Sequence, residues 1–466
     1  MELQFSPFDW FLIGAYFVLL IFLSLHKNWK FVDEETYLLS GRKVTLPAFV
    51  ATLVSTWYGG ILGVGEYSYQ FGVSQWLIFG FPYYVFAIIF AVFLAGKIRE
   101  NKALTIPEAI AQKYGANSGK LSSIAIFVLV SPAPYILMLG LLIQFMIGGT
   151  DYALVYSILV ALFSVAYVSY GGFQAVVRTD ILQMALMFTG FIILIVYAIQ
   201  SFGTPLTLWK ELPESYRDFS GGHSIQYILV WFFIAMWTFV DPGFHQRAAA
   251  ARTPAIARKG ILVSVVFWFV FDCLTLLTGL YGVVMLGDID NPIMVYPYLA
   301  NTILPYGFKG LFFLALLATI MSTLDSFLFL SGQTLGRDLL AKTYTKINRI
   351  TLTRLCVLAS ALLAIILIYI YPSVIALWYV IGSVMIPGLL IPVLGVYIKF
   401  FELPEKRAVI TLVVPVMVSL IWLIIGSIMG DDIYSQVFMG VEPFYPGLLT
   451  SLVIWIYGRS EMNTFR

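Results

Sequence analysis

Charged side chains are scarce in this chain of 466 residues: Asp, Glu, Lys and Arg make up 11% of it, where a soluble domain carries about 25%. The chain has two cysteines and three histidines, and their positions do not suggest a zinc site or a disulfide framework. We find no catalytic triad, phosphate-binding glycine loop or nucleotide motif. The sequence therefore predicts a protein that is not an enzyme, and we expect no nucleic-acid partner.

Apolar residues dominate instead. The chain is 60% hydrophobic and 17% aromatic, with a mean hydropathy of +0.91. It contains thirteen apolar stretches, each about long enough to cross a bilayer as a helix. We therefore expect one all-α, multi-pass domain of about 13 transmembrane helices in the cell (plasma or inner) membrane. The stretches lie near 9–25, 45–70, 73–96, 122–148, 153–169, 179–200, 226–250, 260–286, 309–333, 350–370, 373–400, 407–429 and 443–458.

The basic residues predict the orientation. With the N-terminus outside, the cytoplasmic segments hold all 27 Lys and Arg residues except Lys210, Arg217 and Lys309. Cytoplasmic loops carry an excess of Lys and Arg, so this division favours an outer N-terminus and a cytoplasmic C-terminus. Residues 1–9 contain two acids and no basic residue, which argues against a cleaved signal peptide.

Two of the apolar stretches contain helix-breaking residues. The second holds four glycines and a carboxylate within residues 58–66, and the seventh holds Asp241-Pro242-Gly243. One kinked helix implies little, because Gly and Pro are common in the membrane. A matched pair five spans apart, however, points to the binding site between two inverted halves of a transporter. This spacing predicts 5+5 inverted repeats over 45–200 and 226–400, with peripheral helices at 9–25 and 407–458.

A run of small polar residues at 318–326 interrupts the ninth stretch. Ser322 and Thr323 are adjacent on a helix, so their hydroxyls diverge by about 100° and can hold an ion from two sides. Oxygen ligands are those that a hard cation such as Na⁺ prefers. The alternative is that these hydroxyls bond the carbonyl one turn back or a neighbouring helix. Asp325 could extend a cation site or accept a proton.

Several motifs together resemble one family, the sodium:solute symporters. They occur in order over residues 49–395, so that the resemblance covers most of the chain. The motifs are Phe49 to Thr56 followed by Gly63, Leu104-Thr105-Ile106-Pro107-Glu108 with Tyr114-Gly115, Tyr170-Gly171-Gly172-Phe173-Gln174-Ala175-Val176 with Thr179-Asp180, Gln246-Arg247-Ala248-Ala249-Ala250-Ala251-Arg252, Ser322-Thr323-Leu324-Asp325-Ser326, and Gly382-Ser383 with Pro387, Pro392 and Gly395.

The resemblance implies a LeuT-type inverted-repeat fold and sodium-driven uptake of a small organic solute. It also implies a sodium site that consists of the carbonyls of Leu53, Thr56 and Thr319 and the hydroxyls of Ser322 and Thr323. Some members have a second sodium site, for which the matching residues are Asp180, Ser322, Asp325 and Ser326. Without the resemblance, Asp180 is equally well explained as an acid at the start of a helix.

The break in the seventh span matches the family's substrate and gate region. Phe244 matches the aromatic residue of the inner gate. Asp241 is expected either to bind an amine or hydroxyl of the substrate or to cap the following half-helix. Sugar carriers have polar side chains where this chain has Gly59 and Gly60, and this difference argues against a sugar. Near Gly60, the rings of Trp57 and Tyr58 either line the substrate site or serve packing.

We therefore expect a sodium-coupled symporter that imports a small organic solute by alternating access and works as a monomer in the lipid bilayer. One alternative is a proton-coupled symporter of the same fold, with Asp180 or Asp325 as the proton carrier. Another is a solute sensor that does not transport. The solute itself is not predicted by the sequence.

Overall fold

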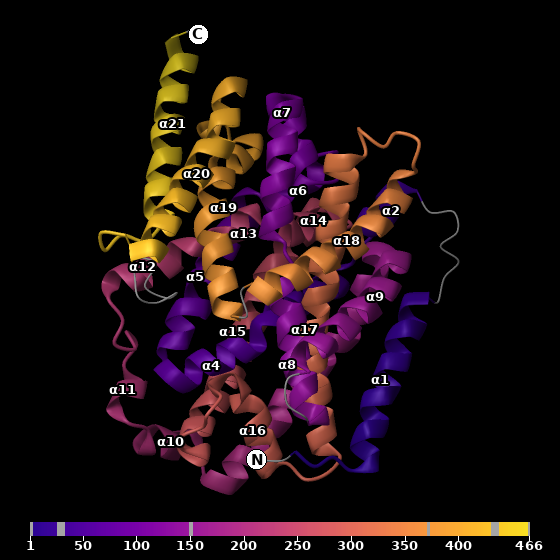
Figure 1. The fold of residues 1–466 in the computed structure, drawn as a ribbon, viewed down its shortest axis with the longest axis vertical. Helices are drawn as coiled ribbons and strands as arrows, with labels where there is room; N and C mark the ends of the chain where they lie inside the picture. The colour runs from indigo at the N-terminus through magenta and orange to yellow at the C-terminus, as the bar shows by residue number, and fades with distance from the viewer. Residues whose placement is uncertain (1–2, 26–32, 149–151, 371–372, 430–437, 465–466) are drawn as a thin grey trace.

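The computed structural model describes residues 3–25, 33–148, 152–370, 373–429 and 438–464, and these residues are almost entirely helical. Figure 1 shows the helices running along the long axis of the molecule, with the start of α1 at one end and the end of α21 at the other. The first half contains α1 (Pro7–Leu25), α2 (Glu34–Leu39), η2 (Ser40–Arg42), α3 (Leu46–Trp57), η3 (Tyr58–Gly60), α4 (Ile61–Phe71), η4 (Trp76–Gly80), α5 (Phe81–Phe93), α6 (Ala95–Glu100), α7 (Ile106–Leu129), α8 (Ala133–Ile147) and α9 (Ala153–Phe202).

The second half begins with short helices on the connection after α9 and continues with the long helices that complete the bundle (Figure 1). Its elements are α10 (Pro205–Glu211), α11 (Glu214–Arg217), α12 (Ile225–Ile234), α13 (Trp237–Val240), α14 (Pro242–Ala250), α15 (Pro254–Leu286), η5 (Pro292–Met294), α16 (Val295–Ile303), α17 (Phe308–Gln333), η6 (Thr334–Leu340), α18 (Arg349–Ile370), α19 (Val374–Tyr397), η7 (Lys399–Phe401), α20 (Glu405–Met429) and α21 (Phe444–Thr464).

Helix α9 folds back on itself at Gly172. Its 50 residues would measure about 75 Å if straight, more than twice the thickness of a hydrocarbon core. Gly172 has φ 61°, and a Cβ there would lie 2.6 Å from Tyr37 Cδ2, so the turn requires glycine. On either side of it, Tyr167 and Asp180 bond to α17 residues that lie one turn apart. Both halves of α9 therefore pack against α17.

Eleven helical stretches of the described residues are long and apolar enough to span a membrane. The folded α9 is one of them, and α21 is not among them. The count of thirteen crossings therefore stays a prediction, as do the boundaries of the two repeats.

Helix α17 occupies the centre of the bundle. Within the apolar stretch of α17 and η6, 94% of the residues are buried, against 28% in α1. The exposed side of α1 is apolar, with Phe8, Phe11 and Phe22 among its residues, as expected for a helix that faces lipid. Asp9 of α1 accepts hydrogen bonds of 2.7 Å from the amides of Gly307 and Gly310, and so fixes α1 to the start of α17.

Candidate functional site

The second span is broken at the predicted glycines. Helix α3 ends at Trp57, a single turn of 3₁₀ helix covers Tyr58–Gly60, and α4 resumes at Ile61. A Cβ at Gly59 would overlap the Thr323 side chain, and one at Gly60 would overlap the Trp378 indole. The glycines therefore let α17 and α19 approach the break closely. The polar side chains of sugar carriers have no room at these two positions.

The seventh span is broken at Asp241, which is extended (φ −69°, ψ 116°) between α13 and α14. Pro242 follows it, at a helix start where the missing amide hydrogen costs nothing. Asp241 Oδ1 accepts hydrogen bonds from the amides of Gly243 at 2.5 Å and Phe244 at 3.1 Å. The carboxylate therefore caps α14, one of the two roles considered from the sequence, and it also lines a cavity.

The residues proposed for the sodium site connect α3 to α17. Thr323 Oγ1 donates a 2.7 Å hydrogen bond to the carbonyl of Thr56, in the last turn of α3. Ser322 Oγ donates a 2.6 Å bond to Asp180 Oδ1. The Thr319 hydroxyl bonds the Ala315 carbonyl one turn back, but the proposed ligand is the Thr319 carbonyl. Leu53 is buried and lines the cavity with Thr56.

A fully buried arginine lies among these oxygens. Arg247 Nη2 donates to Thr56 Oγ1 at 2.7 Å and to Ser326 Oγ at 2.8 Å, and lies 3.7 Å from Asp180 Oδ2. Its remaining nitrogens are 3.3 Å from the carbonyls of Thr52 and Gly243. The distribution of basic residues predicts Arg247 to be cytoplasmic and does not indicate this role. The signal it offered was its position three residues after Phe244, within a helix that begins at membrane depth.

Asp180 belongs to the interior of its helix. The second half of α9 begins after Gly172, so Asp180 is in its third turn, and the interpretation as a helix-start acid is wrong. This half of the helix already includes Phe173 to Val176, which precede the apolar stretch at 179–200. The Asp180 carboxylate accepts hydrogen bonds from Thr52 and Ser322.

The four residues proposed for a second sodium site form one group of three residues and leave Asp325 apart. Asp180 and Ser322 bond each other, and Ser326 is joined to them through Arg247. Asp325 points elsewhere: Tyr167 donates to its Oδ2, and its buried Oδ1 has no hydrogen-bond partner among the described residues.

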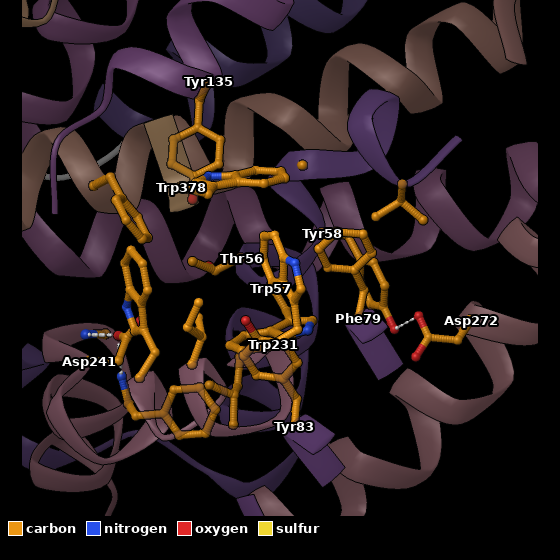
Figure 2. A pocket seen from close by; sticks show the side chains of 18 of the residues that line it. Thr56, Trp57, Tyr58, Phe79, Tyr83, Tyr135, Trp231, Asp241, Asp272 and Trp378 are labelled. Atoms are coloured by element: carbon orange, nitrogen blue, oxygen red, sulfur yellow. Dashed lines mark hydrogen bonds between the residues drawn. The ribbon is translucent and has the colours of Figure 1, made fainter. Parts of the chain in front are cut away.

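A cavity of about 130 Å³ lies between the two broken spans. All five residues predicted from the sequence line it, namely Trp57, Tyr58, Gly60, Asp241 and Phe244. Figure 2 labels Trp57, Tyr58 and Asp241 among them. Phe244 is 2% exposed and packs against the Trp57 ring at 5.6 Å. The lining residues of other elements are not predictable from the sequence, because their periodicity is that of any packed helix. These include Gln75, Phe79, Tyr83, Tyr135, Trp231, Ile234, Trp237, Asp272, Phe327 and Trp378.

Asp272 closes one side of the cavity. Tyr58 donates to its Oδ1 at 2.9 Å, and Tyr84 donates to its Oδ2. Tyr58 Oη also lies 2.8 Å from the Trp268 carbonyl, so its one proton is shared between that carbonyl and Asp272 Oδ1. The arrangement is a buried structural network that fixes Tyr58 at the break.

Comparison with known proteins agrees with this geometry. Residues 37–402 match the Sodium:solute symporter family, and the chain belongs to that family. It is 24% identical over 477 residues to the osmoregulated proline transporter OpuE of Bacillus subtilis (strain 168), covering 95% of this chain and 94% of the relative. The sodium/glucose cotransporter of Vibrio parahaemolyticus is 25% identical, over 66% of this chain and 63% of that protein.

The fold is similar to that of an outward-open, substrate-bound Na⁺-coupled sialic acid symporter. The TM-score is 0.78 at 16% identity, over 98% of this chain and 97% of the other. The chain therefore has the LeuT-type fold expected from its sequence. It is a multi-pass membrane protein and a sodium-coupled symporter of a small organic solute, not an enzyme.

Proposed function

We propose that the coupling sodium binds where the end of α3 meets the middle of α17. Its ligands are the carbonyls of Leu53, Thr56 and Thr319 and the hydroxyls of Ser322 and Thr323. The observation that carries this proposal is the 2.7 Å hydrogen bond from Thr323 to the Thr56 carbonyl, which holds two of these oxygens together. The last carbonyls of α3 lack partners within their helix, and the negative end of a helix dipole favours a cation.

Sodium and solute share residues at this site. Leu53 and Thr56 line the cavity and also supply the proposed carbonyl ligands. An ion that fixes the end of α3 against α17 therefore also fixes the wall of the solute cavity. Because binding free energies are linked, the solute then tightens sodium binding by the same factor as sodium tightens solute binding. Opening of the inner side separates α3 from α17 and releases both ligands.

A second cation site at Asp180 is also proposed. Thr52 and Ser322 hydroxyls already bond this carboxylate, and the Arg247 guanidinium, 3.7 Å away, supplies the compensating charge. A sodium ion at Asp180 would take the place of this guanidinium, with Ser326 and Asp325 as the next nearest oxygens of the set. The alternative second ion is a proton on Asp325, whose Oδ1 has no hydrogen-bond partner in the part of the chain that the structure describes. A sodium titration at fixed pH with a Hill slope near two favours sodium over the proton.

The double substitution Ser322→Ala with Thr323→Ala tests the first site. In detergent, NaCl in place of KCl should raise the Tm of the wild-type protein, and the double variant should lose this sodium-specific rise. Ser331→Ala is the matched control, because Ser331 is a buried serine on the same helix. An unaltered sodium response in a folded double variant would mean that the proposed site is wrong.

The N-terminus is proposed to lie outside and the C-terminus in the cytoplasm, on the basis of the basic-residue distribution. The monomer is proposed as the working unit, because one chain supplies all the cavity and ion-site residues named above. Ser215, exposed in α11, offers a test of orientation. A Ser215→Cys variant should react with an impermeant maleimide added outside intact cells, and protection from it would reverse the assignment.

A further inference from the structure

We propose that the solute is a small organic cation with a compact alkylammonium head, held in the cavity by aromatic rings and Asp241. This inference rests on the proposed function, in which the cavity between the broken spans is the transport site. Three features of the cavity carry it: the chemistry of its walls, the charges that face it, and the polar groups that it lacks.

The walls are formed largely by electron-rich rings. Figure 2 shows Trp378 and Tyr135 on one side of the cavity and Tyr83 and Trp231 on the opposite side, with Trp57 between them. The face of an indole or phenol attracts a cation, and Trp does so most strongly. A quaternary or alkylated ammonium group gains more binding free energy from a cage of aromatic rings than a strongly hydrated ion does, because its methyl groups also pack against the rings.

The available charge on the walls is negative. Asp241, Asp272 and Arg247 are the charged residues that line the cavity. The Arg247 guanidinium already donates hydrogen bonds to Thr56, Ser326 and the Gly243 carbonyl, and it lies 3.7 Å from the Asp180 carboxylate. It is therefore not available to an anionic solute. The Tyr84 hydroxyl donates to Asp272 Oδ2, and the Tyr58 hydroxyl shares its one proton between Asp272 Oδ1 and the Trp268 carbonyl. Asp241 remains as the carboxylate for a cationic head.

Few polar groups are available for a polyhydroxylated solute. Because Gly59 and Gly60 have no side chains, Thr323 and Trp378 occupy the space beside them. An indole therefore lies where sugar carriers have polar side chains. Two lining residues are exceptions, because the Trp231 indole Nε1 and both amide atoms of Gln75 have no hydrogen-bond partner among the described residues. Gln75 is fully buried. Its amide can bind one hydroxyl or carbonyl on the solute. The cavity thus suits a cationic head with a single polar tail group.

Choline and its uncharged isostere 3,3-dimethyl-1-butanol form a matched pair of probes, because they have the same shape and differ in charge. Binding to the purified protein in NaCl is measured by quenching of tryptophan fluorescence. We expect choline to bind at least tenfold more tightly than the isostere. Asp241→Asn should remove most of this preference, since Asn retains the helix cap and loses the charge. Trp378→Phe, which keeps an aromatic ring, should weaken choline binding less than Trp378→Leu.

Equal binding of choline and its isostere would overturn the inference, as would tighter binding of glucose or proline than of choline. An unchanged preference in Asp241→Asn would also overturn it. These outcomes are distinct from failure of the proposed function. If sodium still raises the Tm and the Ser322/Thr323 double variant abolishes the rise, the sodium site stands and the solute class alone is wrong. If the sodium response is absent from the wild-type protein, the proposed function itself fails.

Discussion

Replacing Arg247 with methionine removes the charge at the centre of the ion cluster and keeps an unbranched apolar stem. The guanidinium is fully buried, lies 3.7 Å from Asp180 and donates to Thr56 and Ser326. Its removal leaves the Asp180 carboxylate without a compensating charge. Removal of one partner from a buried ion pair costs about 3–5 kcal/mol, and each kcal/mol corresponds to about 2 °C or less in a protein of this size. We therefore expect the Tm in KCl to fall by up to about 6–10 °C.

Sodium should restore part of this stability. If the vacated space binds sodium beside Asp180 with a Kd of about 1 mM, then 100 mM NaCl adds about 2.7 kcal/mol. The sodium-dependent rise in Tm should therefore be larger in Arg247→Met than in the wild-type protein. The double variant Arg247→Met with Asp180→Asn should recover most of the loss in KCl without gaining the larger sodium response.

The assay is thermal unfolding of the purified protein in NaCl and in KCl at one ionic strength. Arg252→Met is the matched control, because Arg252 is an exposed arginine five residues further along the chain. The reasoning is refuted if Arg247→Met is as stable as the wild-type protein in KCl. It is equally refuted if the sodium-dependent rise in Tm is no larger than that of the wild-type protein.

Two further predictions concern the cavity wall and a buried acid before α21. Gly60→Ala places a Cβ inside the Trp378 indole and should weaken choline binding at least tenfold, whereas Gly14→Ala, with open space around it, should be silent in the same fluorescence titration. Glu442, which lies before α21 and accepts a hydrogen bond from Tyr379, has its pKa raised to about 7 by burial. A raised pKa in the folded state stabilises the protein below pH 4.5, and this contribution is lost as the pH rises through 7. The Tm should therefore fall between pH 5 and 8, and Glu442→Gln should flatten this fall; a parallel pH profile in the variant would contradict the assignment.

The sequence predicted those features of the fold that depend on local composition. Gly59-Gly60 and Asp241-Pro242-Gly243 signal breaks wherever they occur in a helix, and both breaks are in the predicted places. The break at Tyr58–Gly60 is a 3₁₀ turn and not an unwound segment, because Thr323 and Trp378 pack tightly against it.

Features that depend on pairs of distant residues were not predictable in the same way. The burial of Arg247 follows from where α14 meets α3, α9 and α17, and the charge alone suggested a cytoplasmic loop. Gln75, just before η4, and Trp378 of α19 line the cavity because of how these segments pack in the bundle. Nothing in their local sequence distinguishes them from packing residues. The roles assigned to the ion and solute residues stay predictions until they are tested.

The most direct test of the account is solute accumulation by proteoliposomes under an imposed gradient. Radiolabelled choline, proline, glucose and pantothenate are offered to the wild-type protein and to the Ser322→Ala, Thr323→Ala variant. We predict that an inward sodium gradient at fixed pH drives accumulation of one of these solutes, and the chemistry of the cavity favours choline. The double variant should lose this accumulation. Accumulation driven by a pH gradient without sodium, or undiminished in the double variant, would contradict the proposed coupling of solute to sodium between α3 and α17.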